Sequence, residues 1–439
     1  MKRSDVCEHS HPEVYPSIDD GVRKRRGSTV YPEVIAFWET RFGNEMIITS
    51  DVAIVGGGIA GLSAALALTR SGIAVTVLEA GEAQKPDHWG LVIWPAGVRA
   101  LGWLGVLDRV EAEGSRLQSY RWSAKDGREW FCVDLQPLAD AGEWLGILPS
   151  KLVDILATEL RPNDGVRILK GFRFSGLSQA KGGLLKVEGT IGGKEYAVTA
   201  RLVVGADGPD SSLRRTIGIK SWRWRPRGQV IVTGIGGGLR FNELRQSIGS
   251  GWSAGCVTLG GDKSWLYSTV RKGGVTGLKS VQAYAELDRQ AASAFGQLES
   301  VIEVRPWSVR VKRWAADGVV LIGDAAHPVL PHLGLGGNLT LGDVPVLEDV
   351  VIRALRTGNT RASALDEVRR SRSKQVSYAR RISELWALSM TSKLPGLQLM
   401  RDLNFWRMSR HPEFMAAFLR ELSGSQTPDL WTRARVWLP

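Results

Sequence analysis

Cysteine is scarce in this chain of 439 residues, which contains only Cys7, Cys132 and Cys256. The three lie far apart without a Cys-x-x-Cys pair, so the sequence predicts neither a disulfide framework nor a thiolate metal site. Apolar runs are short as well: none reaches the roughly 18 residues of a membrane-spanning helix. The N-terminus lacks the apolar core of a signal peptide. These absences predict a cytoplasmic protein without a membrane span.

Positive charge exceeds negative charge. The 57 lysine and arginine residues against 45 aspartate and glutamate residues give a formal net charge of +12. Much of the excess lies from Arg353 onward, where 16 basic and 7 acidic residues leave +9. A basic surface suits nucleic acid, a membrane or a phosphate-bearing cofactor. Here the cations alternate with apolar residues at helical spacing and belong to no nucleic-acid motif, so we expect a solvated helical face and no nucleic-acid partner.

Tryptophan is abundant, with 17 residues against 7 tyrosines and 10 phenylalanines. Twelve of the tryptophans fall between Trp89 and Trp314. Such rings either fill a hydrophobic core or form the walls of a pocket for a flat aromatic ligand. The sequence leaves both uses open.

The pattern of apolar residues indicates how the chain is organised. DVAIV, residues 51–55, predicts a first strand, followed by a glycine turn, a helix and a second strand at IAVTVLEAG. This order predicts a βαβ unit with parallel strands. Strand-like alternation dominates residues 116–146 and 219–311, and SKLVDILATEL between them predicts a helix. After Asn338 the pattern is helical, with breaks near Pro395 and Pro412.

The segment GGGIAG directly follows the first strand and directly precedes the helix. Its glycines match Gly-x-Gly-x-x-Gly, which provides a tight turn, close backbone approach to a pyrophosphate, and close packing of helix on strand. Glu79 ends the next strand, where a carboxylate accepts hydrogen bonds from ribose hydroxyls. The pattern predicts a dinucleotide with a free 2′-hydroxyl, either FAD or NAD. The residues assigned to it are Gly56, Gly58, Ile59, Ala60, Gly61 and Glu79.

Two later motifs also follow apolar strands. RLVVGADGPDSSLRRTIG, residues 201–218, contains Asp-Gly-x-x-Ser-x-x-Arg. GVVLIGDAAHPVLPHLGLGGN, residues 318–338, contains Gly-Asp and a later glycine cluster. In this order the three motifs resemble the class A FAD-dependent flavoprotein monooxygenases, the aromatic-hydroxylase family of para-hydroxybenzoate and salicylate hydroxylases. The resemblance covers most of residues 46–360.

The resemblance implies FAD as the cofactor and NADH or NADPH as the co-substrate. It places Asp207, Gly208 and Arg214 near the FAD pyrophosphate and the transient nicotinamide cofactor. In the third motif, a carboxylate after the strand can accept hydrogen bonds from ribityl hydroxyls, and glycines let the backbone approach the isoalloxazine. Asn338 is expected to open a helix whose dipole favours the negative charge of reduced flavin. The third-motif residues assigned to the cofactor are Gly323, Asp324, Gly334, Gly336, Gly337 and Asn338.

Two histidines lie within the third motif. With Asp324 they could ligate a metal, but the flavin interpretation makes a metal site unexpected, and His327 is expected to have a structural role in the turn. The resemblance places Pro331 and His332 on a loop that faces the substrate. There the imidazole of His332 could hydrogen-bond or deprotonate a phenol-like hydroxyl.

The chain departs from the family pattern at three positions. Pro149 stands where the family has an arginine that contacts the flavin, and Leu335 stands where a glutamine is common. Pro345 is expected to interrupt the helix that follows the third motif. These departures suggest a modified flavin environment rather than a loss of flavin binding.

The predicted fold is α/β, with a Rossmann-like FAD-binding domain of the GR2 type, an inserted sheet-rich substrate domain and a C-terminal helical region. The predicted boundaries are 1–45 for an N-terminal extension, which we expect to be disordered, 46–115, 147–218 and 312–360 for the FAD-binding domain, 116–146 and 219–311 for the substrate-binding domain, and 361–439 for the helical region.

The resemblance also implies a reaction. NAD(P)H reduces the flavin, O2 adds at carbon 4a, and the flavin hydroperoxide transfers one oxygen atom to an electron-rich aromatic ring. The tryptophans favour a polycyclic or indole-like substrate. The alternatives are a related epoxidase or reductase, and a flavin-dependent halogenase, whose Trp-x-Trp-x-Ile-Pro signature SWRWRPRG at residues 221–228 matches in part. The sequence predicts no particular oligomeric state.

Overall fold

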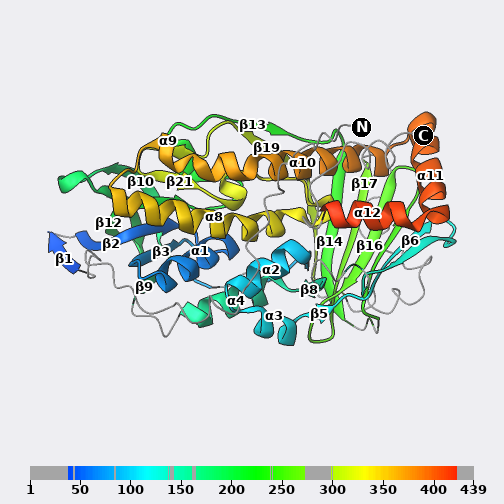
Figure 1. The fold of residues 1–439 in the computed structure, drawn as a ribbon, viewed down its shortest axis with the longest axis horizontal. Helices are drawn as coiled ribbons and strands as arrows, with labels where there is room; N and C mark the ends of the chain where they lie inside the picture. Colours follow the sequence, from blue (N-terminus) through cyan, green and yellow to red (C-terminus); the bar gives the residue numbers. More distant parts are fainter. Residues whose placement is uncertain are drawn as a thin grey trace, which may run out of the picture.

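The computed structural model describes residues 38–42, 45–83, 86–136, 138, 143–160, 165–237, 239, 241–271, 298 and 300–422. Two large β-sheets lie end to end along the molecule, with long helices beside them (Figure 1). One hydrophobic cluster includes residues of both sheets. The predicted α/β organisation is confirmed.

The nine-stranded sheet has a parallel centre with the strand order β9-β3-β2-β12-β21. Parallel strands covered on both faces are apolar along their length, and Val52, Ala53 and Ile54 of β2 are fully buried. Antiparallel strands extend this centre. The strands are β1 (Trp38–Phe42), β2 (Glu45–Val55), β3 (Val75–Glu79), β9 (Val166–Lys170), β10 (Arg173–Gln179), β11 (Leu185–Ile191), β12 (Lys194–Gly205), β20 (Ala315–Ala316) and β21 (Val319–Leu321).

This sheet begins earlier in the chain than the sequence predicts. We expected the body of the protein to start at Met46, but β2 starts at Glu45 and pairs antiparallel with β1. β3 pairs with β2 only at Val52–Val55. The N-terminal part of β2, on the edge that faces away from β12, is therefore available to pair with β1. Residues 1–37 of the predicted extension, which include Cys7, lie outside the described residues.

Helices cover the nine-stranded sheet. Helix α1 packs against α4 and α8, and α8 packs against α10. Both α8 and α10 run along the long axis of the molecule (Figure 1). The helices are α1 (Ile59–Arg70), α2 (Pro95–Trp103), α3 (Leu107–Glu113), α4 (Pro149–Leu160), α5 (Ser212–Thr216), α8 (Leu335–Thr357), α9 (Ala362–Leu365) and α10 (Glu367–Met390), and the short 3-10 helices are η2 (Lys181–Gly183), η3 (Gly323–Ala325) and η4 (Pro331–Leu333).

The expected break in α8 is absent. Pro345 lies inside the helix, which continues to Thr357, although a proline removes one helical hydrogen bond. The helix buries apolar side chains on both sides of the proline, among them Leu341, Leu347 and Val351. Packing of this kind supplies most of the stability of a helix in a protein, so the prediction of an interruption at this position is wrong.

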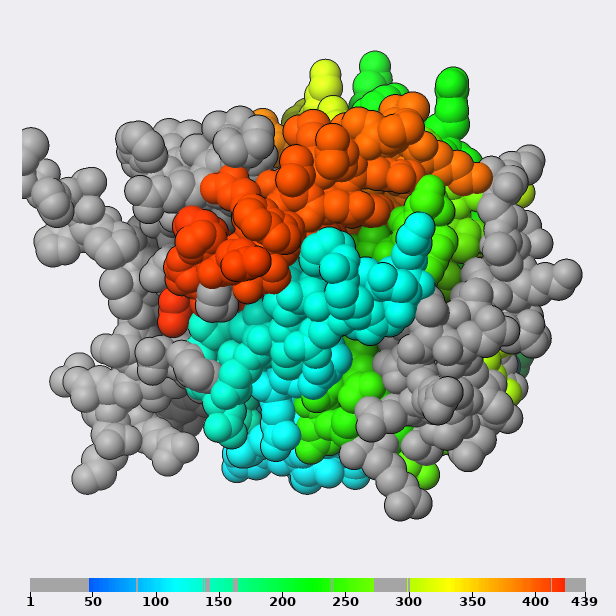
Figure 2. All heavy atoms as spheres, turned by 90° about the vertical axis from the view of Figure 1, so that its right-hand side faces the viewer, coloured from blue at the N-terminus to red at the C-terminus, as the bar shows by residue number. Residues whose placement is uncertain are grey.

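The seven-stranded sheet has the strand order β18-β14-β17-β16-β15-β6-β7. It is antiparallel except where β15 pairs with β6. Helices α11 (Pro395–Arg410) and α12 (Pro412–Leu422) pack on β7, and Figure 2 shows the orange-red atoms of the C-terminal region against cyan atoms of the earlier chain. The strands are β6 (Ser119–Ala124), β7 (Glu129–Asp134), β14 (Gln229–Gly237), β15 (Glu243–Ile248), β16 (Trp252–Thr258), β17 (Lys263–Arg271) and β18 (Ser300–Val304).

Two small sheets complete the described structure. They contain β4 (Leu91–Ile93), β5 (Ser115–Arg116) and β8 (Leu145–Ile147), and the pair β13 (Ser221–Trp224) and β19 (Ser308–Val311). Within the described ranges, every helix is too short or too polar to cross a membrane.

Candidate functional site

The carboxyl ends of four parallel strands meet at one edge of the nine-stranded sheet. Val55 of β2 pairs with Gly205 of β12 and with Leu78 of β3, and Gly205 also pairs with Leu321 of β21. The three sequence motifs directly follow β2, β12 and β21. They therefore come together at the edge where open α/β sheets bind their ligands.

The glycine turn after β2 is shaped by close backbone contacts. Gly56 has a φ of 111°, and a Cβ atom at this position would lie 2.3 Å from the Ala206 carbonyl oxygen at the end of β12. A Cβ atom at Gly61 would lie 1.8 Å from the Gly56 carbonyl oxygen. A Cβ atom at Gly58 would have no neighbour within 4 Å. The turn is thus tight on the protein side and open at Gly58, as the approach of a pyrophosphate requires.

Glu79 holds this turn at the end of β3. Its carboxylate accepts hydrogen bonds from the backbone N–H groups of Gly57 and Gly81, both at 2.6 Å. A carboxylate has lone pairs for further bonds, so these contacts leave acceptor capacity for ribose hydroxyls. The ribose contact itself stays a prediction.

Asp207 and Arg214 organise the second motif. Oδ2 of Asp207 accepts hydrogen bonds from the N–H groups of Ser212 and Leu213, whereas Oδ1 is buried and has no hydrogen-bond partner within the described ranges. The buried Arg214 donates to the carbonyl oxygens of Ala325 and Pro209, both at 2.7 Å. Arg214 therefore ties the second motif to the third, and the unpartnered oxygen of Asp207 is free to accept a bond from a ligand.

The third motif leaves a carboxylate and empty space beside the start of α8. Asp324 makes no hydrogen bond to another described residue, and burial, with a contribution from Asp343, raises the pKa of its carboxyl above the ordinary value, although His327 opposes this. Apart from the adjacent residues and the backbone of α8 itself, the nearest described atom to a Cβ at Gly336 would be 3.8 Å away, in the Val329 side chain, and the nearest to one at Gly337 would be 3.5 Å away, in the Leu91 side chain. This open cradle with one free carboxylate fits the ribityl chain and ring of FAD.

Asn338 does not open the helix as predicted. Helix α8 begins at Leu335 and is capped by Gly334, whose φ of 62° is accessible mainly to glycine. The Asn338 side chain instead accepts a hydrogen bond from the Trp94 N–H at 2.7 Å and donates to the carbonyl oxygens of Val92 and Gly334. The unpaired N–H groups of the first turn therefore belong to residues before Asn338.

A buried ionic network behind the third motif was not anticipated from the sequence. Asp343 is fully buried and pairs with Nε2 of His327 at 2.6 Å, with Nε of Arg372 at 2.9 Å and with the Gly323 N–H at 3.0 Å. The His327 ring also packs on Trp314, with 4.7 Å between ring centroids. The network joins α8, α10 and the turn that carries Asp324, which gives His327 the structural role expected of it.

A pocket lies between the third-motif loop and the seven-stranded sheet. Trp94 and Trp265 are among its walls, whereas Trp122 and Trp144 are buried in the core, so some tryptophans line a pocket and others fill the core. Neither Trp222 nor any other residue of β13 lines it. The lining residues are Trp89, Val92, Trp94, Tyr120, Ile231, Leu244, Gln246, Ser253, Trp265, Tyr267, Thr269, Pro331, His332, Leu333, Gly334 and Trp386.

His332 and Pro331 lie in this lining, on η4. Both ring nitrogens of His332 are buried, and neither has a hydrogen-bond partner among the residues that the structure describes. Burial lowers the pKa of His332 to about 3, so the imidazole is neutral at physiological pH. It can donate one hydrogen bond and accept another, but it has little capacity to remove a proton.

Several pocket residues were missed at the level of sequence. Tyr120, Gln246 and Tyr267 come from three different strands that carry no motif, and Tyr120 lies 126 residues before Gln246 in the chain. The available signal was the alternation in β15, where the residues Leu244 and Gln246 share one face. That signal does not reveal which face meets the pocket.

Comparison with known proteins agrees with this geometry. A family model described as FAD binding domain matches residues 49–232 and 274–381. The chain is 28% identical over 401 residues to 6-methylpretetramide 4-monooxygenase from Streptomyces rimosus, covering 86% of this chain and 93% of that protein.

Two solved structures are similar in fold. The p-nitrophenol 4-monooxygenase PnpA from Pseudomonas putida DLL-E4 has a TM-score of 0.74 at 19% identity, over 86% of this chain and 100% of that one. HpxO from Klebsiella pneumoniae, solved with FAD and uric acid, has a TM-score of 0.73 at 22% identity, over 86% and 97%.

Proposed function

Because the chain belongs to the FAD binding domain family, as a class A flavoprotein monooxygenase, we propose that it uses NAD(P)H and O2 to hydroxylate an aromatic small molecule. The observation that carries the proposal is the position of the third motif. Its glycines adjoin the open cradle at Asp324, and its loop at Pro331–Leu333 forms a wall of the aromatic-lined pocket. Cofactor and substrate would thus meet across a single loop.

The residues of the chain have separable tasks in this proposal. Gly56 and Gly58 would admit the pyrophosphate, and Asp324 would accept hydrogen bonds from the ribityl hydroxyls. The unpaired N–H groups of the first turn of α8 would favour negative charge on a bound flavin, as in its reduced form. When bound, FAD supplies the two-electron chemistry that activates oxygen. The apolar and aromatic walls of the pocket exclude water from the reacting ring.

The direct test is a screen of polycyclic, indole-like and monocyclic aromatics with the purified holoenzyme. We expect one class to stimulate NAD(P)H oxidation with matching oxygen uptake and to yield a product that gains one oxygen atom. If compounds of every class tested bind but none yields an oxygenated product, the proposal loses its basis. Incorporation of added bromide or chloride would instead support a halogenase.

A second prediction concerns His332. Since its imidazole is neutral, we propose that it orients the substrate by hydrogen bonding. We expect His332→Gln to retain kcat within about tenfold, because an amide preserves one donor and one acceptor, and His332→Leu to raise KM more than it lowers kcat. If His332 instead acts as a general base, kcat of His332→Gln should fall about 100-fold or more. The variant should then also lack the pH-dependent decrease in kcat that protonation of His332 causes in the wild type.

A further inference from the structure

We propose that the pocket selects uncharged aromatic ligands and excludes anionic ones, with Gln246 as the specificity-determining residue. The inference rests on the proposed function for the location of the substrate site. It goes further because it specifies the charge of the molecule that binds there and the side chain that hydrogen-bonds to the polar group of that molecule.

The described lining of the pocket carries no formal charge. Of its sixteen residues none is an aspartate, glutamate, lysine or arginine. Its one readily titratable side chain, His332, is neutral at physiological pH. Burial raises the pKa of the Tyr120 and Tyr267 hydroxyls, so both keep their protons. Among the described lining residues, an anionic ligand would find hydrogen-bond donors but no cation.

Gln246 is the central polar group of the sheet side of the pocket. It is 4% exposed, and its Oε1 accepts hydrogen bonds from the hydroxyls of Tyr120 at 3.1 Å and Tyr267 at 3.4 Å. The other end of the amide has no hydrogen-bond partner among the described residues. Whichever way the amide is turned, the two tyrosines engage one end and the other end can bind a ligand.

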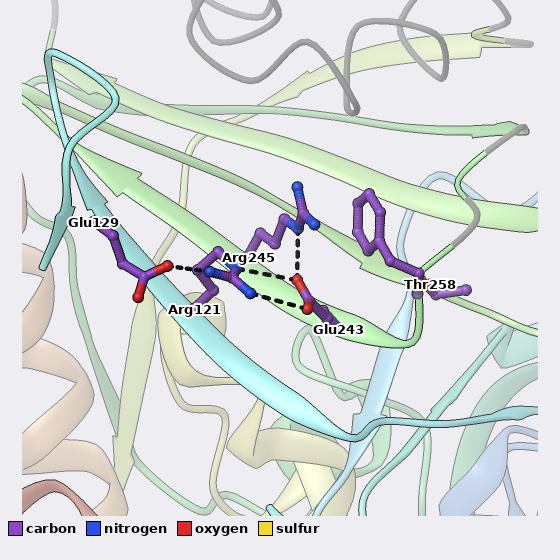
Figure 3. Close-up of polar contacts among 6 residues, drawn as sticks. Arg121, Glu129, Glu243, Arg245 and Thr258 are labelled. Atoms are coloured by element: carbon purple, nitrogen blue, oxygen red, sulfur yellow. Dashed lines mark hydrogen bonds and ion pairs between the residues drawn. The ribbon is translucent and has the colours of Figure 1, made fainter. Parts of the chain in front are cut away.

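The charged side chains of β6 and β15 lie on the face of the sheet opposite to the pocket. Side chains alternate between faces along a strand, so Arg245 points away from the side of Leu244 and Gln246, and Arg121 points away from the side of Tyr120. Figure 3 shows the resulting cluster, in which Arg121 lies between Glu129 and Glu243.

This cluster is internally neutralised. Glu243 accepts hydrogen bonds from Arg121 at 3.2 Å and from Arg245 at 2.7 Å, and the Arg245 guanidinium stacks 3.6 Å from the centroid of the Phe241 ring. Two arginines are therefore held by two glutamates and an aromatic ring. They are not directed at a ligand on the far side of the sheet.

On the loop side of the pocket, the described lining residues are also neutral. Both ring nitrogens of His332 and the indole Nε1 of Trp94 are buried and have no hydrogen-bond partner in the described part of the chain. Buried polar groups normally find hydrogen-bond partners, and a ligand with neutral carbonyl, hydroxyl or N–H groups would provide them. A carboxylate would be desolvated there without a compensating charge, which is costly.

The test uses two probes of one shape, naphthalene-2-carboxamide and naphthalene-2-carboxylate, with the oxidised holoenzyme and no NAD(P)H. Binding is followed by quenching of tryptophan fluorescence and by the change in flavin absorbance. Near neutral pH we expect the affinity for the carboxamide to exceed that for the carboxylate by about 100-fold or more. On acidification the carboxylate should gain roughly tenfold in affinity per pH unit, because it binds as the neutral acid, whereas the carboxamide should not change.

Variants then assign the selectivity to one residue. Gln246→Leu should weaken carboxamide binding about tenfold, while the same change at the exposed Gln118, the matched control, should leave it unaltered. Gln246→Arg should reverse the preference toward the carboxylate. Thermal unfolding and flavin content of each variant show whether it is folded.

The outcomes separate the two proposals. Equal binding of the two probes by the wild type, or carboxylate binding that is independent of pH, overturns the inference even if the Gln246 variants do not fold. Carboxamide selectivity unchanged in a folded Gln246→Leu removes the assignment to Gln246. Selective binding without hydroxylation of any aromatic leaves the pocket selectivity intact and contradicts the proposed function.

Discussion

Replacing Gly56 by alanine is expected to yield a protein that no longer retains flavin and unfolds more easily. The added Cβ would lie 2.3 Å from the backbone oxygen of Ala206 and 2.9 Å from Cα of Asp207, and the φ of 111° is unfavourable for any residue except glycine. Neither neighbour is a flexible side chain, so strands β2 and β12 would have to separate. We expect a loss of about 3 kcal/mol or more in the free energy of unfolding.

Gly58→Ala is the matched control for this prediction. A Cβ atom there meets no protein atom within 4 Å, and its φ of −79° is allowed for alanine. The flavin-free variant should match the wild type within about 0.5 kcal/mol, while FAD affinity should fall about 10- to 100-fold because the methyl group occupies the approach of the pyrophosphate. Thermal unfolding with and without FAD, and flavin content after purification, measure both effects. Full flavin content in Gly56→Ala would show that close approach at this turn is unnecessary.

The second large effect is expected for Asp343→Ala. This substitution removes the carboxylate from a fully buried site and leaves the Arg372 guanidinium, 4% exposed, without its charge partner. Removing one partner of a buried ion pair costs about 3–5 kcal/mol. The turn at Gly323 would also lose its hydrogen bond from N–H to Oδ2 of Asp343. We therefore expect a lower midpoint of thermal unfolding together with weaker FAD retention.

The pH dependence provides the control for this prediction. Burial alone raises the pKa of Asp343, but His327, Arg372 and the Gly323 N–H lower it more, so the net shift is downward. A carboxyl whose pKa is lowered by folding makes its full contribution to stability at pH values above its pKa in the unfolded chain, about 3.9. That contribution is lost as the pH falls through the lower pKa of the folded state. The stability difference between wild type and Asp343→Asn should thus be constant from about pH 8 to about pH 5 and narrow below about pH 4. A difference that widened on acidification would contradict this assignment.

The cofactor end of the molecule was largely predictable from the sequence because its signals are local. An apolar strand, a glycine turn and a helix occupy consecutive residues, and the φ of Gly56 and the open side of Gly58 are properties of that one turn. The errors there concern boundaries: α8 begins at Leu335 rather than Asn338, and it continues through Pro345. Both arose because packing and a single left-handed glycine outweighed local propensity.

The substrate end depended on the tertiary structure. Tyr120, Gln246 and Tyr267 reach one another only through the pairing of β6, β15, β16 and β17. A shift of that register by one residue would exchange Gln246 for Arg245 on the pocket face. Likewise, Asp343 meets Arg372 only because α8 packs against α10. The sequence by itself determined the dinucleotide turn and the class of cofactor, since consecutive residues specify them. Only the tertiary structure decided the charge of the pocket, because strand register selects the face that each side chain occupies.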